Sequence, residues 1–191
     1  MNWVRRAAIA AAIVGVAAPA AAQNSGFAGV EFVGAVRTGD NGKALELLKS
    51  NPRVIDARDA RGETALFAAV AGRDTSWIGY LLNQGADPNL ANKAGDTPLI
   101  AAARIGFVDA AEWLLTKGAK VDAANRMGET PLIVAVQGRQ VPIIRLLLSE
   151  GADPDRSDSA AGLSARDYAK RDTRAREILK IIEARKPQPA L

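Results

Sequence analysis

Histidine and cysteine are both absent from the 191-residue chain. Histidine is the usual general base near neutral pH, cysteine supplies the thiolate nucleophile, and the two are the commonest zinc ligands. Their absence excludes most hydrolytic mechanisms, the usual zinc sites and disulfide bonds. We therefore expect no catalytic residue, no metal and no cofactor, and a fold whose stability comes from packing alone.

A strong excess of one sign of charge is also missing. Lysine and arginine number 25 against 21 aspartate and glutamate, and no run of five or six like charges occurs. Two of the basic residues, Arg5 and Arg6, lie in an N-terminal stretch that we expect to be removed, and 25 less these two leaves 23 against 21. Such a balance gives no reason to expect a nucleic acid partner.

The first 22 residues have the pattern of a signal peptide. Arg5 and Arg6 precede an alanine-rich apolar run over 7–18, and the small residues 20–22 suit a cleavage site. The run is shorter than the ~20 apolar residues that span a bilayer, which disfavours an uncleaved anchor. The residues around the arginine pair do not complete a twin-arginine motif, so the ordinary secretory route is favoured. We predict export to the periplasm with 1–22 removed, a loose lead-in over 23–29 and a disordered tail over 185–191.

One pattern occurs three times at a spacing of 33 residues, over 62–86, 95–119 and 128–152. Each copy reads as a helix pair between two turns. A fixed period of this length is typical of a solenoid, in which each unit buries its apolar face against its neighbours. The sequence therefore predicts an all-α fold of stacked helix-turn-helix units.

The predicted domain runs over 30–184. Its full repeats are placed at 59–91, 92–124 and 125–158. The flanking units keep the pattern in degraded form, and the last is much more polar. Because terminal units expose one face to water, we interpret 30–58 and 159–184 as the N-terminal and C-terminal caps.

Local signals agree with this period. Each unit opens with a turn that has Asp or Asn first and Gly fourth, as a type I turn prefers. A hydroxyl residue then stands where it can cap the inner helix: Thr64, Thr97, Thr130 and, in the last unit, Ser164. The outer helices are predicted to end at residues that accept left-handed backbone, namely Asn51, Gly85, Gly118 and Gly151.

The G-x-T-P-L strings that begin at Gly95 and Gly128, together with L-L-x-x-G-A at the same period, resemble ankyrin repeats. The likeness covers Val30 to about Ala184. The histidine that ankyrins often place after T-P-L is replaced here by Phe67, Ile100 and Ile133. The resemblance implies L-shaped units whose turns project as β-hairpin fingers, and a concave surface of fingers and inner helices that binds a protein partner.

Candidate contact residues follow from that implied surface. Acidic residues recur directly before the capping position, and basic residues occupy the finger tips, so the fingers carry a mixed stripe of charge. Met127 at a tip and Ile105 at an inner-helix end are the apolar candidates. The predicted partner-binding residues are Arg61, Glu63, Lys93, Asp96, Arg104, Ile105, Arg126, Met127, Glu129 and Gln137.

The leading hypothesis is a monomeric, non-enzymatic module that binds another periplasmic or envelope protein. An immunity or inhibitor protein that neutralises an enzyme in the same compartment is the alternative within the binding class. From a different class, a carboxylate-dependent hydrolase would use Glu63, Asp96 or Glu129, but beside exposed turns we expect these acids to be solvated or near the next helix start. A structural role through an outer stripe of Tyr80, Trp113 and Leu146 is a further alternative, although packing between units better explains aromatic residues at helical spacing.

Overall fold

The computed structural model describes residues 20–184, with side chains from Phe27 onward. The predicted signal peptide, apart from residues 20–22, lies outside the described residues, and so does the predicted tail over 185–191. No helix of the described part is long and apolar enough to cross a membrane.

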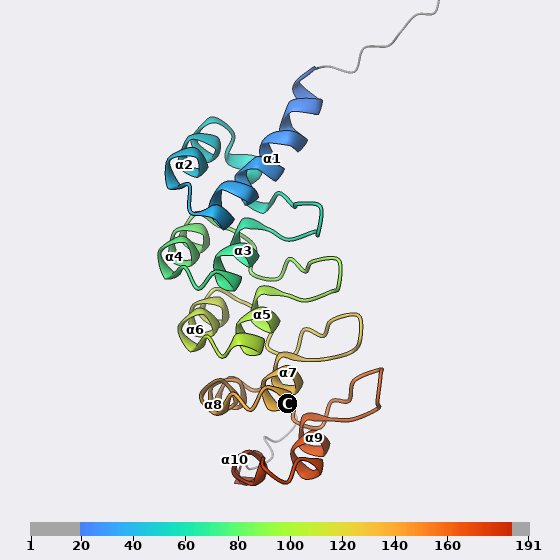
Figure 1. Cartoon of the computed structure of the whole chain (residues 1–191). Helices are drawn as coiled ribbons and strands as arrows, with labels where there is room; N and C mark the ends of the chain where they lie inside the picture. The colour runs from blue at the N-terminus through green and yellow to red at the C-terminus, as the bar shows by residue number, and fades with distance from the viewer. Residues whose placement is uncertain (1–19, 185–191) are drawn as a thin grey trace, which may run out of the picture.

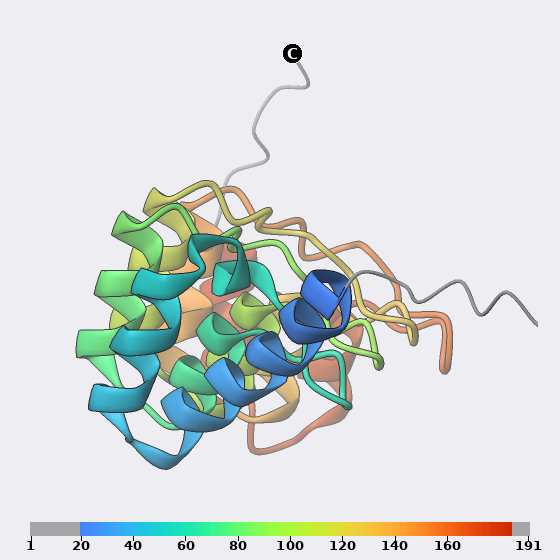
Figure 2. The same ribbon diagram turned by 90° about the horizontal axis from the view of Figure 1, so that it is seen from above.

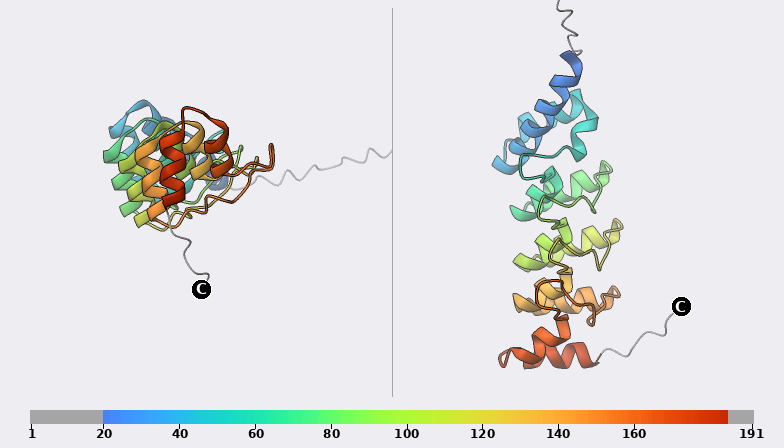
Figure 3. Two further views of the ribbon diagram at one scale, coloured as in Figure 1. Left: turned by 90° about the horizontal axis from the view of Figure 1, so that it is seen from below. Right: turned by 90° about the vertical axis from the view of Figure 1, so that its right-hand side faces the viewer.

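Within that part the chain forms five antiparallel helix pairs stacked in one column (Figures 1 and 3). The first helix of each pair lies on the inner side: α1 (Ala20–Thr38), α3 (Ala65–Ala71), α5 (Pro98–Ile105), α7 (Pro131–Gln137) and α9 (Ala165–Arg171). The second lies on the outer side: α2 (Asn41–Ser50), α4 (Thr75–Asn83), α6 (Val108–Thr116), α8 (Val141–Ser149) and α10 (Arg176–Ala184). A short 3-10 helix, η1 (Pro52–Asp56), follows α2. The all-α solenoid predicted from the period is therefore confirmed.

The inner helices begin where the hydroxyl residues predict. The side chains of Thr64, Thr97 and Thr130 accept hydrogen bonds from backbone N–H groups three residues later, at 3.2, 3.3 and 3.3 Å. Ser164 does the same at 3.2 Å, and Asp167 returns the contact by accepting from the Ser164 N–H at 3.1 Å. Each cap supplies a partner for an N–H group that the helix itself leaves unpaired.

The core is a continuous layer between the inner and outer helices. Leu66, Leu99 and Leu132 from the inner helices are almost fully buried, among alanines whose small side chains let successive units approach closely. The outer helices contribute Leu114 and Leu147, which are buried completely. Because every unit packs on the next, burial of apolar surface holds the whole column together.

Two expectations about the first unit are wrong. The lead-in over 23–29 is not loose, because helix α1 runs through it from Ala20. A reason lies at Gly29, which is so close to Ala57 that a Cβ there would come within 2.5 Å of the Ala57 Cβ. Asn51 has a φ of −144° and is not left-handed; its side chain instead accepts from Arg53 N and begins η1. The other predicted helix ends, Gly85, Gly118 and Gly151, do have positive φ.

The turns after the inner helices share one backbone feature that the sequence does not reveal. Arg73, Gly106 and Arg139 lie 33 residues apart and have φ values of 57°, 65° and 52°. Glycine enters this left-handed region freely, whereas arginine does so at a cost. Both arginines reach the next unit: Arg73 donates to Ile105 O at 3.1 Å, and Arg139 donates to Asp172 at 2.6 Å. These contacts help to offset the backbone cost.

The outer stripe packs only in part. The Trp113 ring covers Gly79, where an added Cβ would come within 1.9 Å of the ring, yet nearly half of Trp113 remains exposed. Tyr80 makes an edge contact with Trp77, with ring centroids 5.5 Å apart, and Leu146 packs partly buried against the core. The prediction of packing between units holds for Trp113, which packs on Gly79 of the preceding unit, but Tyr80 and Trp113 also leave apolar surface in water.

Candidate binding surface

Four loops, here called the fingers, project from the column on the side away from the outer helices (Figure 2). They comprise residues 58–63, 91–96, 124–129 and 157–163. In the first finger Asp59 N donates to Glu63 O at 2.9 Å and Gly62 N donates to Asp59 O at 2.9 Å, so the turn closes as a hairpin does. The predicted β-hairpins form without strands in the described chain, where the only β pairing is an isolated bridge between Ser157 and Ser164. The arms are too short for a ladder.

The second residue of each of the first three fingers fixes the turn through its side chain. Asp59 Oδ1 accepts hydrogen bonds from the N–H groups of Arg61 and Glu63 at 2.8 and 2.9 Å. Asn92 and Asn125 make the same pair of contacts in the next two fingers. The predicted preference for Asp or Asn therefore has a direct cause, since both side chains present the oxygen that the turn needs.

Neighbouring fingers are joined through their backbones near the tips. Lys93 N donates to Arg61 O at 3.0 Å, Arg126 N to Ala94 O at 3.1 Å, and Ser159 N to Met127 O at 2.8 Å. One hydrogen bond of the same kind thus connects each finger to the one before. The fingers form a row of fixed spacing, which is the preorganisation that a binding surface requires.

The predicted acidic row lies at the base of the fingers and is paired internally. Glu63 accepts from Arg37 at 2.7 Å and lies 3.3 Å from Arg61 Nη2. Asp96 is buried and accepts from Arg104 at 2.7 Å. Of the two expected settings, solvated or near the next helix start, solvation is wrong for Glu63 and Asp96, because arginine side chains pair with both carboxylates.

The third member of the row has neutral partners. Glu129 accepts from Gln137 at 3.4 Å and from Asn125 Nδ2 at 2.9 Å. Asn125 Nδ2 also donates to Asp96 at 2.9 Å, so one amide connects the acids of two successive units. The structure therefore gathers Asp96, Arg104, Glu129 and Gln137, all predicted as contacts, into one hydrogen-bonded group.

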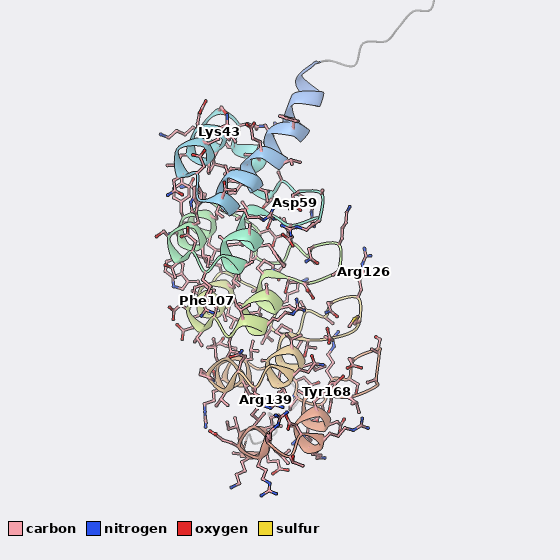
Figure 4. All side chains as sticks on the ribbon, viewed as in Figure 1. Lys43, Asp59, Phe107, Arg126, Arg139 and Tyr168 are labelled. Atoms are coloured by element: carbon pink, nitrogen blue, oxygen red, sulfur yellow. The ribbon has the colours of Figure 1, made fainter. Side chains whose placement is uncertain are left out.

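The remaining candidates lie nearer the solvent. Lys93 and Arg126 are exposed, and Arg126 lies on the finger side of the column (Figure 4). Among the described residues neither side chain forms an ion pair. Met127 is 51% exposed beside them. Ile105 is half-buried and packs against the core, so it offers less apolar surface than its position in the sequence predicts.

Comparison with known protein families now decides the class of this architecture. The sequence pattern described as Ankyrin repeats (3 copies) matches residues 32–125 and again 73–158. The chain belongs to the ankyrin-repeat family. Ankyrin repeats are generally protein–protein interaction modules and are typically non-enzymatic. The finger row is accordingly the first place to look for partner contacts.

Sequence reasoning missed two parts of this ankyrin-repeat surface. Arg37 at the end of α1 bridges Asp59 and Glu63 at 2.8 and 2.7 Å, but it belongs to the degraded first unit and has no counterpart at the repeat spacing. The second part was visible in the spacing: Asp56, Asn89 and Asp122 recur every 33 residues, and each accepts a backbone N–H from the following unit, at 3.1, 2.9 and 3.1 Å. These contacts form a second series of hydrogen bonds between successive ankyrin units, in addition to those near the finger tips.

Two acids of the fingers have shifted pKa values. Burial opposes ionisation of Asp59, but hydrogen bonds from the Glu63 N–H and from Arg37 outweigh it and lower the pKa. In the fourth finger the Tyr168 hydroxyl donates to Asp158 at 2.6 Å, which lowers the pKa of Asp158 and raises the pKa of Tyr168. Both acids are held ionised to support the turns, a structural task.

The ankyrin scaffold brings no metal-binding group together in the part of the chain that the structure describes. No three acidic side chains there converge as a cation site would require. The arrangement that remains is a rigid row of charged tips with an exposed methionine, which is suited to contact with another macromolecule.

Proposed function

We propose that this chain is an exported, non-enzymatic ankyrin-repeat protein that binds another protein of the periplasm or cell envelope through its finger row. The observation that carries the proposal is the fixed row of fingers, joined tip to tip by backbone hydrogen bonds and carrying exposed side chains that make no ion pair within the described fold. Such a surface loses little conformational freedom when a partner docks. Membership of a family of interaction modules supports the same conclusion.

The size of the surface supports a stable contact. Four finger tips with about three residues each, and about two from each inner-helix end, approach the roughly 20–30 residues per side of a standard interface. The predicted leader over 1–22 supports export, since a basic start, an apolar run and small residues at its end are the features of a signal peptide.

The hydrolase alternative has little support. Glu63 and Asp96 are held by arginines, and Glu129 is held by two amides. A catalytic carboxylate needs a free oxygen facing a pocket that retains substrate. A hollow of about 310 Å³ lies instead between outer helices α4 and α6, beside Trp113.

The test is capture of a partner from an envelope fraction by the full chain, produced with its own leader and a C-terminal tag. The variant Arg126→Glu with Met127→Ala changes two exposed tip residues. We expect it to lose the captured protein while its thermal unfolding transition stays nearly unchanged. A control, Lys49→Glu with Lys117→Glu, reverses two exposed charges on the outer face and should capture normally.

Capture that survives the tip variant and disappears in the outer-face control would overturn the proposal. A chain found wholly in the cytoplasm with its leader intact would overturn the export part. If the captured protein is an enzyme, its activity with and without the chain distinguishes an inhibitor from a scaffold.

A further inference from the structure

On the finger side the acidic side chains are more buried than the basic ones. The exposed fraction of the side chain is 9% at Asp59, 15% at Glu63 and 8% at Asp96. It is 62% at Arg61 and 49% at Arg104. The sequence predicts a stripe of mixed charge, but a docking partner meets its positive members first.

These acids are also occupied. Each of Asp59, Glu63 and Asp96 accepts a short hydrogen bond from an arginine of the chain itself, at 2.8, 2.7 and 2.7 Å. A cation on a partner would therefore have to displace an existing ion pair to reach them. An anion meets no such competition at Lys93 and Arg126, which are exposed and form no ion pair within the described residues.

From this difference in exposure we propose that the finger row recognises an acidic segment of its protein partner. In this proposal Lys93 and Arg126 contact carboxylates of the partner. Met127, which follows Arg126 in the third finger, contacts an apolar side chain next to them. Arg126 N and Ser159 N are already bonded to the neighbouring fingers, so the tips keep their positions while the side chains engage. This inference rests on the proposed function, because it specifies the chemistry of the same surface.

A protein segment suits this surface better than nucleic acid does. The charges of the finger side, with the acids beneath, form a nearly balanced set: Arg37, Arg58, Arg61, Lys93, Arg104 and Arg126 against Asp59, Glu63, Asp96, Glu129 and Asp158. A phosphate backbone binds through many uncompensated cations. Few free cations beside an exposed methionine instead match a few carboxylates beside an apolar residue, over distances at which salt screening is incomplete.

The experiment measures fluorescence anisotropy of a fluorescein-labelled peptide of alternating aspartate and leucine with the full chain. The same peptide with asparagine in place of aspartate removes the charge, and a labelled oligothymidylate tests for general binding of polyanions. The test variant is Lys93→Gln with Arg126→Gln. Its matched control is Lys49→Gln with Lys117→Gln, two exposed lysines of the outer side that also form no ion pair in the described fold.

We expect the aspartate peptide to bind, the asparagine peptide to bind at least about fivefold more weakly, and the tip variant to lose a similar factor, as exposed ion pairs allow. Affinity should fall with added sodium chloride, since the Debye length shrinks from about 10 Å at 0.1 M to about 3 Å at 1 M. Equal binding of the two peptides, no binding of either, or an effect of the control as large as that of the tip variant overturns the inference. Oligothymidylate binding as tight as the aspartate peptide, lost in the tip variant, overturns it in favour of a polyanion.

The inference and the proposed function can fail separately. If Arg126→Glu with Met127→Ala abolishes capture from the envelope fraction but Lys93→Gln with Arg126→Gln does not, and capture resists salt, the fingers bind a partner that is not acidic. The proposed function then stands and the acidic segment is disproved.

Discussion

Arg104 donates a hydrogen bond of 2.7 Å to Asp96, eight residues before it on the same finger side. One unit later Gln137 makes the corresponding contact to Glu129 at 3.4 Å. The equivalent positions 104 and 137 therefore carry a charged and a neutral donor to the acid eight residues earlier, and of the two acids Asp96 is buried while Glu129 is half-buried. The stability of the fold should therefore depend less on Arg104 than on Asp96.

Arg104→Gln should lower the free energy of unfolding by less than about 1 kcal/mol, because the arginine is half exposed and solvent screens its charge. Asp96→Ala should cost about 1–3 kcal/mol, since it removes a buried carboxylate that accepts from Arg104 and is one of the two acceptors of the Asn125 amide. Urea unfolding followed by circular dichroism measures both. A larger cost for Arg104→Gln than for Asp96→Ala contradicts this assignment.

Leu114→Ala should destabilise the column by roughly 2–5 kcal/mol, the usual range for truncating a buried leucine. Leu114 is completely buried and belongs to α6, which packs between α4 and α8. The exposed neighbour Lys117 provides the control, and Lys117→Ala should change the free energy by no more than about 0.5 kcal/mol. A negligible shift in the unfolding midpoint of Leu114→Ala would show that the core is placed wrongly.

Two glycines of α1 should respond to alanine with opposite signs. At Gly34 an added Cβ meets no atom within 4 Å, so Gly34→Ala should stabilise the protein by about 0.5–1 kcal/mol through helix propensity. At Gly29 the added Cβ would overlap the Ala57 Cβ at 2.5 Å, so Gly29→Ala should destabilise it by about 1–3 kcal/mol. Thermal unfolding of the pair is the measurement. Stabilisation by both would mean that α1 does not pack against the loop at Ala57.

Acid should destabilise the fold through its paired aspartates. The pKa of Asp158 is lowered, first by the Tyr168 hydroxyl, and the pKa of Asp155 is lowered, first by Arg166. The unfolded chain therefore takes up protons at a higher pH than the folded chain. Stability is complete above the ordinary aspartate pKa of about 4 and is lost as the pH falls through the lowered folded values.

The same hydrogen bond acts with the opposite sign in alkali. The pKa of Tyr168 is raised, first by its bond to Asp158, so its stabilisation is complete below about pH 10 and is lost as the pH rises through the higher folded value. Tyr168→Phe removes the bond and should flatten the fall of stability on both sides. Urea midpoints measured across pH test this, and unchanged slopes would disprove a role for the bond.

Local rules made much of the fold predictable. Thr64, Thr97 and Thr130 cap their helices, and Gly85, Gly118 and Gly151 have the positive φ expected of helix ends, because each depends on neighbours within a few residues. The repeat spacing then brings equivalent positions side by side without further assumptions. Membership of the ankyrin-repeat family follows from the same regularity.

Contacts that break the repeat could not be predicted in this way. Arg37 reaches Glu63 across 26 residues from a unit whose own pattern is degraded. Arg73 and Arg139 take a left-handed conformation that their side chains disfavour, since the contacts that stabilise it lie in the following unit. Of the acidic side chains at the base of the fingers, Asp59 and Glu63 are paired by Arg37 through such a contact.

The hydrogen bonds between finger tips are alike from one junction to the next. If the 33 residues 92–124 were excised, Arg126 N would stand opposite Arg61 O, where Lys93 N now donates. The array can thus be shortened or lengthened by whole units while each finger-tip junction keeps its backbone hydrogen bond. Duplication or loss of 33-residue units would change the length of the binding surface in discrete steps, with no new type of contact between fingers.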